Sequence, residues 1–535
     1  MRKPRQVDGI EGYWIDKSFV TRMFDFMNLL NLATKGCVIL AISIGSVQVT
    51  TGQSDKNAVN YEDFGAVGDG VTDDMPAIQK AHEHANKNNL PVRTKPGATY
   101  HLGRKALTAV IETDTDWGTS KFMIDDSQGV ENKSRSLFEI RSTLKPITLK
   151  IDRLKRGQTS LDIKPPNDCL VYVENDKKLM FIRKGGNQNN GTPQKEVFIL
   201  KKDGTIIGAI NWDYDEITKI TAQPLDETLL HIRGGIFTNI ANQMSSDDAT
   251  GYWARNISIK RSRTVVDGVV HIVTGEMQQG LPYGGFLSAD RCAYIEYSNC
   301  VVDGRKSYSK MGKTGAPVPM GTYGYHANLV VDFRMNNCRM GNDINDRSRW
   351  GVVASNFMKN MLVENSILSR VDVHMGVSGS YVIKDCTLGH AGLNAIGSGH
   401  LIVENSTFHS GNLISFRSDY GSTWEGDVVI RNCRWLPPNK SPTLLGMEND
   451  GNHDFGYPCF MPKNIRIEDL TVQEPKGSKA IFLLENPFGK SDNKGPFPFR
   501  ITEKIEIKGF KSMSGAPPQV SSSPKVTEAV KLVIE

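Results

Sequence analysis

The pentapeptides Leu-Val-Glu-Asn-Ser (362–366), Val-Ile-Lys-Asp-Cys (382–386), Ile-Val-Glu-Asn-Ser (402–406) and Val-Ile-Arg-Asn-Cys (429–433) decide the fold of this 535-residue chain. Each is a β-type run that ends in Asn or Asp followed by a small residue, and similar runs end at Cys300 and Cys338. Two successive intervals between the small residues are 20 residues long, and the others are longer. A period near 20 with loop insertions is typical of a parallel β-helix. The sequence therefore predicts a solenoid over residues 231–510.

The composition agrees with a repeat fold. The chain has 50 Gly, 39% apolar and 8% aromatic residues, which excludes disorder and collagen-like structure and fits many tight turns. Basic residues number 64 and acidic residues 59, so the net charge of +5 is too balanced for a dedicated nucleic-acid binder. A small basic excess still permits an acidic ligand in one local cleft. The recurring cysteines are expected to be small core residues rather than disulfide partners.

The region before the repeats contains a second recognisable pattern. The run Phe-Gly-Ala-Val-Gly-Asp-Gly-Val-Thr-Asp-Asp (64–74) is followed by an amphipathic helix at 75–87 and by a strand–Pro-Gly–strand segment at 90–102. This opening resembles that of the pectate-lyase-type, rhamnogalacturonase-like right-handed β-helix family. The resemblance implies that the helix caps the N-terminal end of the solenoid. We therefore expect an all-β, single-stranded, right-handed parallel β-helix with an N-terminal capping helix and a β-rich insertion.

The predicted organisation has five parts. Residues 1–52 form a leader, 53–110 the N-terminal cap, 111–230 the β-rich insertion, 231–510 the β-helix and 511–535 a C-terminal tail. The apolar run at 37–49 is shorter than the roughly 20 residues of a spanning helix, so it favours a cleaved secretory signal with translation starting at Met27, and an uncleaved anchor is the alternative. We expect a secreted, periplasmic or cell-surface monomer. The insertion shows no catalytic constellation.

Candidate site residues lie on consecutive turns between 346 and 425. In Arg370-Val-Asp-Val-His374 the period of two places the three ionisable groups on one strand face and both valines on the other. Equal offsets from the small residues predict one column of Asp346, His374 and Asn394. The candidate catalytic residues are His374, His390, Arg370, Tyr420 and Arg417, and the candidate substrate-binding residues are Arg349, Arg347, Asp346, Asp372, Asn394, Asp419 and Trp424.

This residue set suits β-elimination on a uronic-acid polysaccharide. Arginines neutralise the uronate carboxylate, His374 or His390 removes the C5 proton, and Tyr420 protonates the leaving oxygen. Ca²⁺ is an alternative to the arginines, although no ligand set has convincing spacing and the metal site is unknown. The predicted partner is an acidic polysaccharide, with no nucleic acid and no membrane beyond the leader.

Two other functions remain open. Asp346, Asp372, Asp419 and Glu425 would serve a glycoside hydrolase with paired carboxylates. The motifs of polygalacturonase-type hydrolases and of calcium-dependent pectate lyases are missing, so neither group supplies catalytic residues to this chain. A non-catalytic glycan-binding β-helix is the other alternative.

Overall fold

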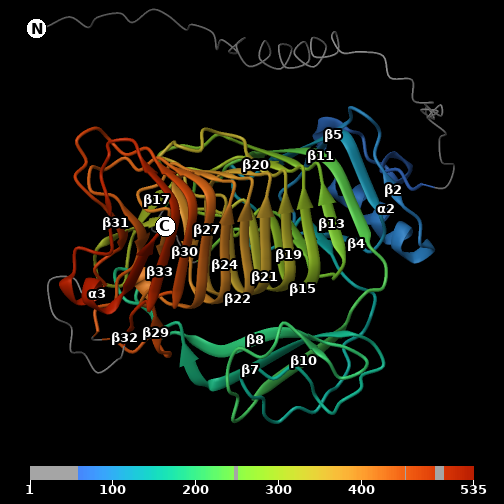
Figure 1. Ribbon diagram of the computed structural model, residues 1–535. Coiled ribbons are helices and arrows are strands. Elements are labelled where there is room, and N and C mark those ends of the chain that lie inside the picture. Colours follow the sequence, from blue (N-terminus) through green and yellow to red (C-terminus); the bar gives the residue numbers. More distant parts are fainter. Residues whose placement is uncertain (1–57, 246–250, 452, 488–498) are drawn as a thin grey trace, which may run out of the picture. The chain divides into compact units, whose positions relative to one another are not determined.

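The computed structural model describes residues 58–245, 251–451, 453–487 and 499–535, and the predicted leader at 1–52 lies outside the described residues. In the described residues, 27 strands form one continuous sheet whose registered pairings are parallel. Figure 1 shows β15, β19, β21, β24, β27 and β30 side by side as successive turns of a coil. The predicted all-β class and parallel β-helix are confirmed.

The strands of this sheet are β1 (Asp69–Asp73), β2 (Val92–Arg93), β3 (Thr99–Leu102), β4 (Ala109–Ile111), β5 (Thr115–Asp125), β6 (Phe138–Ile140), β11 (Leu230–Ile240), β12 (Ile257–Ile259), β13 (Thr264–Asp267), β14 (Val270–Thr274), β15 (Leu287–Ser298), β16 (Val301–Val302), β19 (Tyr325–Asn336), β20 (Arg339–Met340), β21 (Val353–Glu364), β22 (Ile367–Lys384), β23 (Thr387–Ala395), β24 (Gly397–Glu404), β25 (Thr407–Phe408), β26 (Ile414–Phe416), β27 (Trp424–Trp435), β28 (Thr443–Gly446), β30 (Asn464–Val472), β31 (Ile481–Leu484), β33 (Lys504–Ser512), β34 (Pro518–Gln519) and β35 (Lys531–Ile534).

The Asn or Asp of each repeat makes the corner between two strands. These residues adopt left-handed backbone conformations, with φ of 51° at Asn365, 52° at Asp385, 50° at Asn405 and 48° at Asn432. Asn and Asp tolerate this region better than other residues with a side chain. The corners also stack, since Asn432 Nδ2 donates to Asn405 Oδ1 at 2.9 Å. The Asn or Asp recurs in each repeat because each corner needs a residue that tolerates a left-handed backbone conformation.

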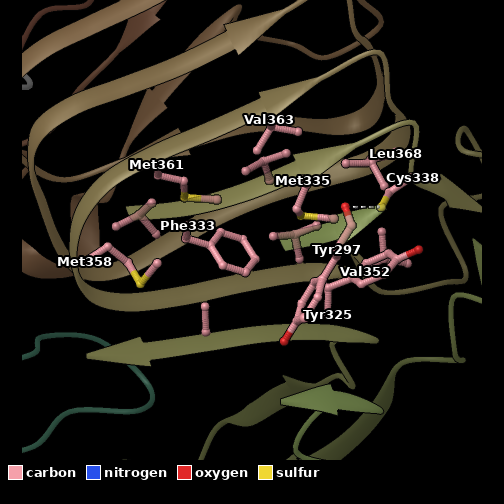
Figure 2. Packing of buried hydrophobic residues seen from close by; sticks show 14 of the residues in the cluster. Tyr297, Tyr325, Phe333, Met335, Cys338, Val352, Met358, Met361, Val363 and Leu368 are labelled. Carbon is pink, nitrogen blue, oxygen red and sulfur yellow. Dashed lines mark hydrogen bonds between the residues drawn. The ribbon is translucent and has the colours of Figure 1, made fainter. Parts of the chain in front are cut away.

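The small residue after each corner points into the core. All seven cysteines of the described chain are buried and free of disulfides, including the four of the repeats, Cys300, Cys338, Cys386 and Cys433. Figure 2 shows Cys338 packed among large apolar side chains of neighbouring turns, with its Sγ 3.3 Å from the Tyr297 carbonyl oxygen. The cysteines act as small core residues, as expected.

Helix α2 (Met75–Asn88) covers the N-terminal end of the coil and follows the short 3-10 helix η1 (Glu62–Phe64). The predicted apolar face is buried, including Ala77, Ile78, Ala81 and Ala85. Asp74 is the N-cap, but its carboxylate accepts the Val67 N–H at 2.6 Å instead of capping the helix. This carboxylate therefore fixes the glycine-rich run against the helix.

The insertion is a separate four-stranded antiparallel sheet formed by β7 (Cys169–Met180), β8 (Thr192–Leu200), β9 (Ile206–Ile207) and β10 (Lys219–Pro224). The predicted boundary at 111 differs from the structure, because β5 and β6 pair with strands of the main sheet. The insertion thus leaves the coil only after β6. It is held to β21 by a buried ion pair in which Lys359 Nζ lies 2.7 Å from Glu196 Oε2.

Two more excursions and the C-terminal end complete the fold. β17 (Tyr308–Met311) and β18 (Pro317–Met320) form an antiparallel hairpin, and β29 (Cys459–Phe460) pairs with β32 (Phe499–Arg500). The predicted tail at 511–535 is part of the coil, since β34 and β35 pair with its last strands around helix α3 (Pro524–Ala529). A search of the described residues finds no helix both long and apolar enough to cross a bilayer.

Candidate functional site

β22 carries the centre of the site. Val371 and Val373 are fully buried in the core, and the alternation of the strand turns Arg370 and His374 away from it. Asp372 lies between them and is itself fully buried. A buried carboxylate requires partners that offset its desolvation.

Asp372 has four partners from three parts of the chain. Arg370 Nη2 lies 2.9 Å from Oδ2, and Arg417 Nη1 lies 3.0 Å from both carboxylate oxygens. The Tyr323 hydroxyl donates to Oδ2 at 2.8 Å, and His374 Nε2 lies 3.2 Å from the same atom. The result is one anion that organises two guanidinium groups, a phenol and an imidazole.

The charges of this cluster are fixed by burial and by the guanidinium groups. Burial alone would raise the pKa of Asp372, but Arg370 and Arg417 outweigh it and hold that pKa well below its usual range. Burial lowers the pKa of His374 to about 4, in spite of the neighbouring carboxylate. Burial, together with Asp372, raises the pKa of Tyr323 well above its usual range. At neutral pH the cluster holds a carboxylate, a neutral imidazole and a protonated phenol.

The hydrogen bonds also determine the imidazole tautomer. The ionised Asp372 only accepts hydrogen bonds, and Tyr323 already donates its proton to it. The neutral ring of His374 therefore carries its proton on Nε2, which faces both Asp372 and, at 3.3 Å, the Tyr323 hydroxyl. This leaves Nδ1 with a lone pair, so His374 is equipped to accept a proton there.

A second carboxylate extends the network. Arg417 Nε and Nη2 donate to the two oxygens of Asp419 at 3.0 and 2.8 Å, and Arg183 Nη2 lies 2.6 Å from Asp419 Oδ2. Burial would raise the pKa of Asp419, but Arg417 and Arg183 keep it below its usual range. Asp419 therefore remains ionised and bridges β-helix and insertion.

These groups border a cavity of about 840 Å³. Its wall includes the aromatic rings of Tyr252, Tyr323 and Trp350. Asp419 is its only carboxylate among the described residues. The cationic residues of the wall are Arg183, Lys184, Lys310, Lys313, Arg370 and Arg417. Such an excess of positive charge favours an anionic ligand.

Five of the residues predicted from the sequence line this cavity, and Asp372 lies beneath it. The five are Arg370, His374, Asn394, Arg417 and Asp419. Asn394 accepts a hydrogen bond from Arg370 Nε at 2.7 Å, which orients the guanidinium group.

Two predicted aromatic residues lie elsewhere. Trp424 is fully buried in the core, because at the start of β27 its side chain points inward, so it is not a platform for substrate. Tyr420 ends the short 3-10 helix η3 (Ser418–Tyr420) and is buried against Arg183 and Arg417, whose guanidinium carbons lie 5.4 and 5.7 Å from its ring centroid. It does not line the cavity in which Arg370, His374 and Arg417 meet, so the structure does not place it for the predicted acid role.

Asp346, Arg347 and Arg349, in the loop before β21, are also outside the cavity wall, although Trp350 of the same loop lines it. Arg349 Nη1 pairs with Glu276 at 3.1 Å and its Nε pairs with Asp346 at 3.3 Å, while Arg347 is exposed. These contacts stabilise the loop and leave Arg349 without a place at the cavity.

The predicted stacking of columns fails because the register shifts. Leu368 pairs with Leu388, 20 residues later, but Arg370 pairs with Gly392, 22 residues later. Asp346, His374 and Asn394 therefore do not form one column, and Arg370 is not registered with His390. His390 is half-buried outside the cavity wall, and its pKa is lowered by burial and by Arg347.

Sequence reasoning missed several residues of the cavity. Tyr323 stands in a Gly-Thr-Tyr-Gly run before β19, and Lys310 and Lys313 belong to the β17–β18 hairpin. Arg183 and Lys184 come from the insertion, in which the sequence showed no catalytic constellation. The glycines around Tyr323 were the one local signal that could have pointed to it.

The described residues were also compared with the side-chain groupings that hold metal ions. Among the described residues, no group of three or more His, Cys, Asp or Glu side chains is arranged to hold a metal ion.

Comparison with solved structures gives several β-helix proteins. The tailspike protein gp49 of Pseudomonas phage LKA1 has a TM-score of 0.50 and 13% identity, covering 89% of this chain and 84% of that one. The tailspike gp61 of Pseudomonas phage phi297 has a TM-score of 0.45 and 15% identity over 89% of this chain and 84% of that one. At these identities the likeness concerns the fold. The likeness to gp49 and the parallel pairing of successive turns show that the chain has the right-handed parallel β-helix fold.

Sequence comparison adds little. No family model matches the chain. It is 29% identical over 102 residues, 19% of its length, to an uncharacterised 30.4 kDa protein of Mesostigma viride, of which the match covers 39%.

Proposed function

We propose that the protein is a polysaccharide lyase that cleaves a uronic-acid-containing glycan by β-elimination. The observation that carries the proposal is the juxtaposition of a neutral His374, a protonated Tyr323 and Arg370 on a basic cavity wall. β-Elimination needs a neutralised carboxylate, a base for the C5 proton and an acid for the leaving oxygen. These three groups supply the three functions.

Arg370 is suited to hold the uronate carboxylate. Its guanidinium group has five N–H donors, and the contacts to Asp372, Asn394 and Tyr323 use three of them. The remaining donors can bind a carboxylate, and Lys310 and Lys313 have no ion-pair partner among the described residues. Pairing with these cations makes the C5 proton more acidic, because it stabilises the negative charge that develops on the carboxylate.

His374 and Tyr323 divide the proton transfers. His374 Nδ1 takes the C5 proton, and the imidazolium ion that forms is stabilised through Nε2 by Asp372. The Tyr323 hydroxyl turns its proton from Asp372 to the glycosidic oxygen and gives it up as the C4–O bond breaks, and the phenolate left behind faces Arg370 Nη1 at 3.3 Å. The chain is cleaved between C4 and its oxygen, and a double bond forms between C4 and C5.

Hydrolysis by paired carboxylates is less well supported. It requires one carboxyl group to be protonated as a general acid, which calls for a raised pKa. Asp372 and Asp419 both have lowered pKa values, and Asp372 is enclosed by its partners. The remaining alternative, binding without cleavage, would use the same basic wall.

We also propose that the protein works outside the cytoplasm, because the apolar run at 37–49 is typical of a secretory signal. Export of a fusion carrying residues 1–60 ahead of a reporter would test this, and retention of that reporter in the cytoplasm would contradict it.

The cleavage experiment uses pectic, alginate and glycosaminoglycan polymers and follows the ultraviolet absorbance of unsaturated uronates. His374→Ala and Tyr323→Phe should each lower the cleavage rate by at least about a hundredfold. His390→Ala changes a residue outside the cavity and should keep the wild-type rate. New reducing ends without this absorbance would indicate hydrolysis, and binding without either signal would indicate a glycan-binding protein.

A further inference from the structure

Two excursions of the chain meet above the candidate site. One is the loop 181–191 between β7 and β8, and the other is the β17–β18 hairpin at 308–320; we call the pair the arch. Val318 is 9% exposed, although its hairpin neighbours Pro317 and Pro319 are exposed. A Cβ atom on Gly186 would lie 3.0 Å from Val318 Cγ2, and one on Gly312 would lie 2.5 Å from the Gly186 carbonyl oxygen. The Gly312 position excludes a side chain, because its Cβ atom would collide with backbone of the loop, so the two halves are in tight contact.

Each half of the arch is fixed to the coil. In the loop, Ile182 N–H donates to the Phe455 carbonyl oxygen at 3.1 Å and Lys184 N–H donates to that of Asp419 at 3.0 Å. At the other foot, Gly321 follows the hairpin directly and packs against the Trp350 ring, where a Cβ atom would not fit. The arch therefore stands on both sides of the Asp372 cluster.

The arch and the coil border the same cavity. Lys184, Gly186, Gly312 and Val318 line it together with Arg370 and His374 of the coil. Its volume of about 840 Å³ is large enough to hold a short segment of a glycan chain. Because the two halves of the arch contact each other at Gly186 and Val318, the interior of a long polymer chain cannot be laid beneath them from the side.

We propose that the arch makes the enzyme act at chain ends, so that an acidic polysaccharide enters by threading a free terminus beneath it. The inference rests on the proposed lyase activity and adds its mode of attack. Lys310 and Lys313 place two cations on the arch, where they bind acidic groups of the threaded segment. The arch therefore limits the length of the segment that can bind and favours segments with negative charge.

A cross-linked protein tests the arch. In a disulfide, one Cβ atom and the opposite sulfur are about 3 Å apart, which matches the 3.0 Å from a Gly186 Cβ to Val318 Cγ2. The variant Gly186→Cys/Val318→Cys should form this disulfide on mild oxidation, and the seven native cysteines of the described chain are all buried and will not compete. Failure of the two thiols to join, against the single Gly186→Cys variant as control, would show that the halves do not meet and would overturn the arch.

The products then test the mode of attack on whichever polymer of the panel is cleaved. We expect short products of uniform size, a slow fall in viscosity, and a rate in the oxidised double variant within twofold of that of the same variant kept reduced. Val318→Asp should open the arch and produce mixed, longer products, whereas Ala316→Asp, an exposed position on the same hairpin, should behave as wild type.

The outcomes separate the two proposals. Mixed internal products from the wild type would overturn the chain-end mode and leave the lyase intact. A tenfold loss of rate on oxidation that a reductant reverses would also overturn it, because the arch would then be a lid that opens. Absence of cleavage in every variant would refute the lyase assignment, and with it the mode of attack, even if the disulfide forms.

Discussion

Asp372→Asn tests whether one buried anion organises the site. The substitution keeps the shape of the side chain and removes a negative charge that Arg370 and Arg417 contact at 2.9 and 3.0 Å. Removing one partner of a buried ion pair costs about 3–5 kcal/mol, since the remaining charge stays buried without compensation. The amide oxygen can still accept the Tyr323 hydrogen bond, so we expect about 3 kcal/mol, the lower end of that range.

Urea denaturation measures this loss as a shift of the midpoint at constant slope. The matched control is Asp419→Asn, which removes a carboxylate from the same Arg417. The side chain of Asp419 is 23% exposed, whereas that of Asp372 is 0% exposed. Solvent compensates part of the loss at Asp419, so we expect about 1 kcal/mol there. Equal losses in the two variants, or a loss below about 1 kcal/mol for Asp372→Asn, would refute the central role of Asp372.

The same variant should change the titration of His374. Asp372 raises the pKa of this imidazole against the larger effect of burial, which lowers it to about 4. Without the carboxylate the pKa should fall further, and the proton should lose its preference for Nε2. NMR titration of the labelled imidazole reports both, and an unchanged or raised pKa would show that the two groups do not interact.

Four further predictions concern pH, the corners, the insertion and metals. Because the folded pKa of His374 is about 4 and its ordinary value is 6.5, only the unfolded chain protonates this ring between these values. His374 should therefore lower the free energy of unfolding by roughly 3 kcal/mol as pH drops from 6.5 to 4, and His374→Gln should remove this share, while the share of the buried His82 remains. In activity, the rate should rise through pH 4 and stay level to neutral pH; a rise centred near pH 6.5 would contradict the buried base. Asn405→Val, at φ 50°, should lower the free energy of unfolding by about 1–2 kcal/mol, and Asn405→Gly should lose less; equal losses would exclude backbone strain. Lys359→Met should cost about 3–5 kcal/mol by leaving Glu196 buried without its partner, and adding Glu196→Leu should restore most of it. Activity should survive EDTA, because cationic side chains already line the cavity; a loss that Ca²⁺ reverses would disprove this.

The repeat, the corners and the capping helix could be predicted because each follows from local sequence. Asn405 and its equivalents have to be Asn or Asp where the backbone is left-handed, and the next residue has to be small to fit the core. Helix α2 shows its buried face directly in the spacing of its alanines. Such features need no knowledge of distant parts of the chain.

The candidate site could be predicted only where its residues share a strand. Arg370, Asp372 and His374 follow from the alternation of β22. Arg183 comes from the insertion and pairs with Asp419, and Tyr323 comes from a loop and contacts Asp372. The glycines around Tyr323 indicate a turn, but nothing local indicates which distant carboxylate either residue meets. Trp424 was placed on the wrong side because the loop before β27 hides the residue at which its alternation begins.

The site lies where the regular repeat breaks, and this supports a functional interpretation of the cluster. The offset between β22 and β23 changes from 20 to 22 residues immediately before Arg370, so this side chain leaves the column that a regular turn would give it. A buried carboxylate with two guanidinium groups stabilises a core less than apolar side chains of the same volume would. A solenoid that otherwise fills its interior with Val, Leu and Cys gains no stability from such a cluster. Departures of this kind, where local rules are broken at a cost, are expected at sites that bind or react. This irregular turn also lies beneath the arch. Arg370 and His374, which belong to the cluster that gives the coil no stability, are therefore the residues that a threaded glycan chain would contact.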